Sequence, residues 1–399
     1  MSFSDLVQFL SANSFAQLEV QHGVCHRFSA DGRKVSLNYD QILVKNGDRV
    51  AEVCRGLVIQ PNKKLSSAND IVGEFVTLAR PMDRFYNHGD VCAATLDWAN
   101  TKNIRVYEKL DGTMIALYFD YVLDVWCVAT RGVPEADQPL PDSLQLSSET
   151  ALTFSKLFWK AASETTGNVK KFLDSLEKEN TYVFELTTPL NRVVVTYNDY
   201  RITLIAVRNN KTGEEVEITK ANVSYVPLPK SWNIFDPSAI KAFVETVPCS
   251  ELEGIVAVDM NSSFFKRLKI KSMSWSLSSK AKALVTVSKR AAMESIATGT
   301  IDDVLTIIDI SIADQLRNMI DKYTTYVKNV DANFLKFKSL ANNDKKTFAL
   351  AVKDLNEWSA PYFALWDNRA NSCHEWIKWS FENNRIAIGS IDYLLSRVT

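Results

Sequence analysis

The chain has 399 residues, of which 46% are hydrophobic and 23% charged, with a formal net charge of -1. This length and composition can bury the cores of two or three domains. No apolar run reaches the length of a membrane span, and the N-terminus lacks a basic segment followed by an apolar block. We therefore expect no membrane partner. The near-neutral charge disfavours a protein that coats nucleic acid non-specifically. The scattered cysteines form no CxxC pair, so we expect reduced thiols and a cytoplasmic location.

From about residue 35 to residue 271, short apolar runs alternate with turn signals, which is typical of β-strands. The predicted strands are Glu52–Ile59, Ile104–Tyr107, Met114–Phe119, Val122–Ala129, Tyr182–Leu186, Val193–Tyr197, Ile202–Val207 and Ile255–Val258. Two segments with apolar residues three or four positions apart, Ser147–Leu176 and Ala239–Val247, are predicted helices. This mixture predicts an α+β fold with mainly antiparallel sheets and flanking helices.

After about Ser279, strand signals disappear and helical spacing continues to the C-terminus. A stripe of apolar residues runs from Ile312 to Phe337 at helical spacing. Further helices are predicted at Lys345–Trp358, Pro361–Asn371 and Ile386–Ser396. The sequence therefore predicts a first domain of residues 1–278 and an all-helical C-terminal domain of residues 279–399.

The segment Lys109 to Gly112, which reads KLDG, lies between two predicted strands. A lysine at a strand end, with a glycine three residues later, can bring its amine to a phosphorus atom while the backbone stays close to a nucleotide. The KxDG pattern alone also fits an ordinary hairpin turn. Its interpretation therefore depends on the other polar segments of the first domain.

Four such segments accompany it: Arg55 with Gly56, Phe184 with Glu185, Glu253 with Gly254, and a strand containing Lys269 and Lys271. Alternation along that last strand puts both lysines on one face. Two lysines on one face form either a phosphate clamp or a solvated strand edge.

In this order, KxDG, FE, EGxVAV and KIK resemble the covalent nucleotidyltransferase superfamily of ligases and capping enzymes. Longer strings are similar to the T-even bacteriophage RNA ligase 1 family, which repairs tRNA. Those strings are Arg55–Ile59, Arg80–Asn87, Phe184–Val194, Ile202–Asn209, Leu252–Val258 and Leu268–Ser272. The resemblance covers about residues 35–275, and it suggests a phage or viral origin.

The resemblance implies that residues 1–278 form an adenylyltransferase domain that uses ATP and Mg²⁺ or Mn²⁺. Lys109 would be the nucleophile that accepts AMP, with Lys269 and Lys271 as catalytic cations on the ATP phosphates. The implied ATP-binding residues are Arg55, Arg84, Tyr86, Gly112, Arg131, Glu185 and Glu253. Tyr86 would lie against the adenine, and Glu185 and Glu253 would also serve the metal. Arg84 and Arg131 replace family lysines, which keeps the charge but changes the donor geometry.

This set of residues suits phosphoryl transfer, which depends on positioning and on neutralising charge around phosphorus. A free lysine has a pKa near 10.4 and is protonated at pH 7, so an attacking lysine must first lose its proton. Neighbouring cations and desolvation favour that loss. Carboxylates such as Glu185 and Glu253 are the hard oxygen ligands that Mg²⁺ prefers.

The stretch from Asn261 to Arg290 carries lysines and arginines and no acidic residue. We expect it to contact the RNA backbone through Lys266, Arg267, Lys280 and Lys282. The alternative is a solvated basic face without function.

The predicted function is an ATP-dependent RNA ligase that forms lysyl-AMP, transfers AMP to an RNA 5′-phosphate and joins that end to a 3′-hydroxyl. The expected partner is RNA with such ends, with nicked tRNA as a hypothesis, and the chain is expected to act as a monomer. No GxxxxGK[ST] loop is present, so we expect no kinase module, and the 5′-phosphate must come from elsewhere.

Two alternatives remain. One is an RNA-binding protein with an inactive ligase-like domain, which only an adenylylation assay can exclude. The other is a DNA ligase or a capping guanylyltransferase, whose resemblance implies a β-barrel after the lysine strand where this sequence turns helical.

Overall fold

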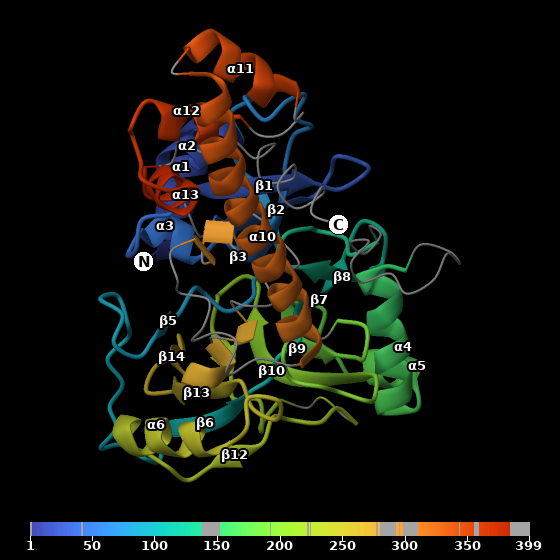
Figure 1. Cartoon of the computed structure of the whole chain (residues 1–399). Coiled ribbons are helices and arrows are strands. Elements are labelled where there is room, and N and C mark those ends of the chain that lie inside the picture. Colours follow the sequence, from blue (N-terminus) through green and yellow to red (C-terminus); the bar gives the residue numbers. More distant parts are fainter. Residues whose placement is uncertain are drawn as a thin grey trace. The chain divides into compact units, whose positions relative to one another are not determined.

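The computed structural model describes residues 2–40, 43–137, 152–191, 193–221, 223, 225–276, 278–279, 293–294, 296–297, 310–342, 344–354 and 359–383 (Figure 1). Contacts within the chain group it into two compact units, Met1–Trp275 and Ser276–Thr399. This division lies close to the predicted boundary after residue 278, while the assignment of the two units as functional domains stays a prediction. The class is α+β, as predicted.

The first sheet of unit 1 is antiparallel and has the order β1-β2-β3-β4. Its strands are β1 (Val24–Phe28), β2 (Val35–Tyr39), β3 (Arg55–Pro61) and β4 (Phe75–Ala79). The helices α1 (Ser2–Ala12) and α2 (Phe15–His22) pack on it and share its core through Leu6, Leu10, Phe15 and Leu18. The short helix α3 (Arg49–Glu52) leads into β3. Neither α1 nor α2 was among the predicted helices.

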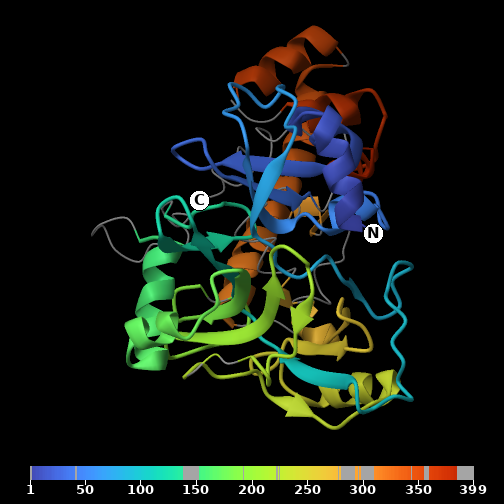
Figure 2. The ribbon, with the colours of Figure 1, turned by 180° about the vertical axis from the view of Figure 1, so that it is seen from behind.

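The second sheet has the order β11-β10-β9-β7-β8 and is antiparallel throughout. Its strands are β7 (Thr113–Asp120), β8 (Val125–Thr130), β9 (Asn180–Thr187), β10 (Arg201–Asn209) and β11 (Glu215–Val216). The helices α4 (Phe154–Thr166) and α5 (Val169–Asp174) lie along this sheet, as Figure 2 shows from behind. The single helix predicted from Ser147 is therefore divided, because Gly167 ends α4 with a φ of 66°.

The third sheet has the order β12-β6-β13-β14-β5. Its strands are β5 (Tyr86–Asn87), β6 (Ile104–Lys109), β12 (Ser231–Trp232), β13 (Gly254–Asp259) and β14 (Lys266–Lys271). The helix α6 (Pro237–Thr246) covers one face, where Ile240 and Val244 contact the apolar side chains of β6, β13 and β14. Because side chains alternate along a strand, the neighbouring positions of the same strands face the other way. That second face carries the candidate site.

The predicted strand Val193–Tyr197 is wrong, because these residues have no strand structure. The amides of Val194 and Val195 donate instead to one carboxylate oxygen of Asp111, at 2.7 and 2.8 Å. Amides that point at a side chain in this way cannot take part in a strand ladder.

The described residues of unit 2 form helices joined by short turns and contain no strand, as predicted. It contains α10 (Ile310–Leu340), α11 (Lys345–Asp354), α12 (Ala360–Trp366) and α13 (Cys373–Glu382). Tyr323 and Val330, from the predicted stripe of α10, are buried in a core with Phe348, Tyr362 and Ile377. The helix predicted at Ile386–Ser396 lies outside the described residues. Within the described part of the chain, no helix is long and apolar enough to cross a bilayer.

Candidate active site

The second face of the third sheet carries side chains in regular cross-strand rows. Strand pairing aligns β6, β13 and β14 so that every second residue of each strand belongs to one row. Row one is Lys109, Gly254 and Lys271; row two is Tyr107, Val256 and Lys269; row three is Arg105, Val258 and Arg267. A column of small or apolar residues on β13 thus separates two columns that are mostly cationic. This arrangement offers a flat apolar strip between positive charges.

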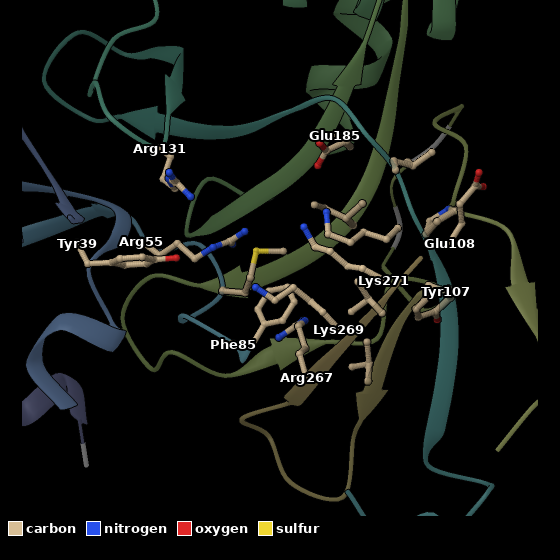
Figure 3. A pocket seen from close by; sticks show the side chains of 17 residues that line it. Tyr39, Arg55, Phe85, Tyr107, Glu108, Arg131, Glu185, Arg267, Lys269 and Lys271 are labelled. Atoms are coloured by element: carbon tan, nitrogen blue, oxygen red, sulfur yellow. The ribbon is translucent and has the colours of Figure 1, made fainter. Parts of the chain in front are cut away.

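A cavity of about 240 Å³ lies over this face, with a further wall from the first two sheets (Figure 3). Six of the ATP-binding and catalytic residues predicted from the sequence line this cavity: Arg55, Lys109, Arg131, Glu185, Lys269 and Lys271. Arg267, which was predicted to contact RNA, lines it as well. Its remaining lining residues are Tyr39, Met82, Phe85, Tyr107, Glu108, Leu110, Ile205, Pro229, Val256 and Val258. In Figure 3, Arg55 and Arg131 lie on one side of the cavity, with Lys269 and Lys271 reaching in from β14. Six residues that are far apart in the sequence and were predicted for one site therefore meet in one place.

Glu253 connects the two lysines of row one. Its carboxylate lies 2.8 Å from the Lys109 Nζ through Oε2 and 2.8 Å from the Lys271 Nζ through Oε1. The residue is 2% exposed, so little water competes for these ion pairs. Glu253 does not line the cavity itself. It contributes through its two ion pairs, which hold both ammonium groups of the row.

The Asp111 carboxylate fixes the loop that follows Lys109. Besides the two backbone amides of the segment Val193–Tyr197, its Oδ2 accepts a hydrogen bond from the Trp275 indole at 3.1 Å. The same indole lies 4.3 Å below the Lys271 Nζ, measured to the ring centroid. Trp275 therefore contacts both the loop after the predicted nucleophile and a lysine of row one. The sequence argument gave no role to either Asp111 or Trp275.

Glu185 projects into the cavity from β9 and accepts a hydrogen bond from the Gly112 amide at 3.0 Å. Burial and the nearby Glu253 carboxylate raise the pKa of Glu185 to about 7, against the opposing effect of Lys109. Gly112 is required there because a Cβ atom would overlap the Leu186 carbonyl oxygen. Gly112 thus reaches the site through Glu185 and does not line the cavity.

The cations of the cavity act on one another. Burial, together with the neighbouring charges of Lys271, Arg55 and Lys109, lowers the pKa of Lys269 to about 7. Burial also lowers the pKa of Arg55, whose guanidinium lies 5.2 Å from the Phe85 ring centroid. Nearby cations and low water access both favour a bound anion, because the anion removes the repulsion among them.

Arg84 and Tyr86, which the resemblance placed at the nucleotide, do not line the cavity. Arg84 stacks between the rings of Tyr39 and Tyr86 and donates to the Asn46 side chain at 3.0 Å. The Tyr86 hydroxyl donates to Glu52 Oε1 at 3.1 Å. Phe85, the residue between them, faces the cavity, because successive side chains of an extended segment point in opposite directions. This corrects the expectation that Tyr86 lies against the adenine.

The predicted RNA contacts divide into three kinds. Lys266 is exposed on β14, as an RNA contact requires. Arg267 is 7% exposed and donates to both carboxylate oxygens of Glu215, at 3.0 and 2.5 Å, so its place in the cavity corrects the expectation of a surface contact. Lys280 and Lys282 lie outside the described residues.

Of the two predicted metal ligands, Glu185 fits that role and Glu253 does not in this arrangement. Glu185 projects into the cavity, whereas both oxygens of Glu253 are engaged by ammonium groups. Among the described residues, no group of three or more His, Cys, Asp and Glu side chains could hold a metal ion. Mg²⁺ is commonly held by one or two carboxylates together with substrate phosphates, so Glu185 is sufficient on the protein side.

The cavity thus gathers the side chains of Lys109, Lys269, Lys271, Arg55 and Arg131. Residues 53–275, more than half of the chain, match a family model described as RNA ligase, of the T4 RNA ligase 1 type. The chain belongs to this RNA ligase family.

Two curated relatives are similar over most of the same region. An RNA ligase of Rhodothermus phage RM378 is 25% identical over 243 residues, which are 55% of this chain and 49% of the relative. A predicted bifunctional polynucleotide kinase/RNA ligase of Autographa californica nuclear polyhedrosis virus is 26% identical over 246 residues, 58% of this chain and 32% of that protein. The match therefore spans half or less of the length of these relatives. Among solved structures, an archaeal ATP-dependent RNA ligase aligns with 79% of this chain and 78% of its own, at 14% identity and a TM-score of 0.45.

Proposed function

We propose that this protein is an ATP-dependent RNA ligase in which Lys109 carries AMP as a covalent intermediate. The observation that carries the proposal is row one: the Lys109 amine stands at a strand end, aligned with Lys271, inside a cavity lined by further cations. A lysine in a surface hairpin would not need a buried carboxylate such as Glu253 as its partner. It would also not need a glycine such as Gly254 beside it, where a Cβ atom would overlap the neighbouring strand.

The charge distribution sets the direction in which ATP binds. Row one brings Lys109 and Lys271 to the cavity, and Lys269 of row two lies next to them on the same face. At the row three end, Arg267 is neutralised by Glu215, and Arg105 pairs with Glu217 at 2.9 Å. The triphosphate therefore belongs at the row one end. The base belongs over Val256 and Val258, whose side chains are apolar and line the cavity.

The chemistry then follows in three steps. The Lys109 ammonium first gives up a proton, and its neutral amine attacks the α-phosphorus of ATP. The bond from this phosphorus to the bridging oxygen breaks, pyrophosphate leaves, and the nitrogen releases a second proton to water. A 5′-phosphate oxygen of RNA displaces the lysine from the α-phosphorus, which restores the free amine. A 3′-hydroxyl then attacks the RNA phosphorus, loses its proton and releases AMP.

The residues of the cavity position and neutralise the reacting groups. Lys269 and Lys271 face the same side as Lys109 and are placed to hold the non-bridging phosphate oxygens. Glu185 would hold a divalent cation together with those phosphates, and such a cation would neutralise charge on the phosphate oxygens when bound. Arg55 and Arg131 remain for a second phosphate, such as the 5′-phosphate of RNA.

We also propose that the substrates are RNA ends with a 5′-phosphate and a 3′-hydroxyl, as the reaction requires. The chain is proposed to act as a monomer. Nicked tRNA is the proposed physiological substrate, on the basis of the family resemblance alone.

A ligation assay tests the proposed function. A 5′-phosphorylated RNA oligonucleotide with a 3′-hydroxyl is incubated with the protein, ATP and Mg²⁺, and joined products are separated by electrophoresis. We expect wild type to ligate, Lys109→Ala to be inactive, and Lys211→Ala to match wild type, since Lys211 is exposed on a turn outside the cavity. RNA binding by wild type without any ligation would instead support an RNA-binding protein with an inactive ligase-like domain.

A further inference from the structure

Tyr107, in row two beside Lys269, has a buried hydroxyl that the proposed mechanism does not use. The side chain is 8% exposed and its ring lines the cavity. Its hydroxyl oxygen has no hydrogen-bond partner among the residues that the structure describes. Buried hydroxyls without a partner are uncommon, because the group has lost its water without gaining a replacement. A ligand in the cavity would supply the missing partner.

The position of Tyr107 along β6 indicates which part of the ligand that is. Tyr107 is two residues before Lys109, so their side chains share a face and the strand separates them by about 7 Å. The hydroxyl interacts electrostatically with Glu217, Arg105 and Arg267. Arg105 and Arg267 are members of row three, and Glu217 is the ion-pair partner of Arg105. That end is neutralised within the protein by the Arg267–Glu215 and Arg105–Glu217 pairs. A nucleobase fits there better than a polyphosphate.

We propose that the Tyr107 hydroxyl donates a hydrogen bond to a ring nitrogen of the ATP purine, so that Tyr107 is a specificity-determining residue of the site. This inference rests on the proposed function, because it takes the nucleotide and its direction from the row one chemistry. A hydroxyl is suited to the task because purines present unprotonated ring nitrogens as acceptors. The ring of Tyr107 meanwhile supplies part of the wall beside Val256.

The test compares wild type with Tyr107→Phe, which removes the hydroxyl and keeps the ring. Single-turnover adenylylation is followed with ATP and with its 1-deaza, 3-deaza and 7-deaza analogues, each of which lacks one ring nitrogen. We expect Tyr107→Phe to raise the ATP concentration for half-maximal rate about tenfold, and to change the maximal rate less than about twofold. One analogue should be about tenfold poorer for wild type and equally good as ATP for the variant.

Thermal unfolding separates this reading from a purely structural one. An unpartnered hydroxyl contributes no internal hydrogen bond, so the Tm of nucleotide-free Tyr107→Phe should equal or exceed that of wild type. The matched control is Tyr118→Phe, because the Tyr118 hydroxyl is buried outside the cavity and donates to the Pro134 carbonyl at 2.8 Å. That control should lower the Tm by about 2–4 °C and leave the use of ATP unchanged.

Three outcomes would overturn the inference: an unchanged ATP dependence in Tyr107→Phe, a Tm loss like that of the control, or a variant that keeps every penalty of the deaza analogues. Failure of the proposed function looks different, because wild type itself would form no adduct. In that case calorimetric titration of wild type and Tyr107→Phe with ATP still reports on the hydroxyl, and equal affinities would overturn the inference.

Discussion

Glu253 forms ion pairs of 2.8 Å with both the Lys109 and the Lys271 ammonium groups, and so links the two lysines of row one. We expect Glu253→Gln to slow adenylylation about 10²-fold, since a neutral amide holds neither lysine in place and small misplacements of reacting groups have large effects on rate. The rate is measured in a single turnover at saturating ATP. Glu251→Gln, two residues earlier and exposed, is the control and should behave as wild type. A Glu253→Gln rate within threefold of wild type would show that the bridge is not needed.

Glu185 gives a prediction about pH, because burial raises its pKa to about 7 from an ordinary value of 4.5. The folded protein then binds this proton more strongly than the unfolded chain. The stabilisation by the protonated carboxyl is complete below about pH 4.5 and is lost as the pH rises to about 7. At pH 8 the buried Glu185 carboxylate is charged, and Glu185→Gln removes the cost of burying that charge. The change in free energy of unfolding caused by the substitution should therefore be more stabilising at pH 8 than at low pH, by about 2–3 kcal/mol, in the nucleotide-free protein.

The measurement is thermal unfolding of Glu185→Gln and wild type at pH 8 and pH 5. The Tm advantage of the variant should shrink as the pH falls. The exposed Glu179→Gln serves as the control and should show no such trend. An advantage of Glu185→Gln that is independent of pH would contradict the assigned cause.

For single residues, the sequence analysis identified the charged residues of the cavity but missed two aromatic residues next to them. Lys109, Arg55, Arg131, Lys269 and Lys271 were assigned through ordered motifs, and all five line the cavity. Tyr107 was missed although its spacing of two from Lys109 in a predicted strand implied a shared face. Phe85 was missed because the resemblance gave the place beside the adenine to its neighbour Tyr86. A match between two sequences does not show in which direction the side chains of an extended segment point.

Among the elements, β13 and β14 depend on a glycine where they meet beside Lys109. A Cβ atom on Gly254 would lie 2.7 Å from the Lys271 Cα and would overlap the Ile270 carbonyl oxygen. Gly254→Ala should therefore push the strands apart, lower the stability by about 1–3 kcal/mol and abolish the alignment of row one. Adenylylation and Tm together measure this. Gly132→Ala, where a Cβ meets nothing within 4 Å, should be close to neutral in both.

The predicted strands of the third sheet were right in position, since alternation and turn residues are local properties. The segment Val193–Tyr197 was predicted wrongly because its run of β-branched and aromatic residues is typical of a strand. What decides its conformation is the buried Asp111 carboxylate, more than 80 residues away in the sequence, which takes up two of its amides. Such a tertiary contact leaves no local signal.

For the whole molecule, the division into two units leads us to expect that adenylylation and the choice of RNA can be separated. Row one and the cavity belong entirely to Met1–Trp275, so removing residues 276–399 should leave adenylylation of Lys109 intact. We propose that the helical unit contributes to the choice of RNA, so the truncated protein should seal nicked tRNA less well relative to a generic single strand. Circular dichroism melting first establishes that the truncated chain is folded. Equal losses on both RNAs would contradict a role in tRNA selection.

The central claim is that Lys109 becomes covalently adenylylated. Intact-mass spectrometry of wild type and Lys109→Ala, each freed of AMP and then incubated with ATP and Mg²⁺, measures this directly, and peptide mapping locates the adduct. The account predicts one adenylyl group on wild type, on Lys109, and none on the variant. An adduct on another residue, or no adduct on wild type that is demonstrably AMP-free, would contradict it.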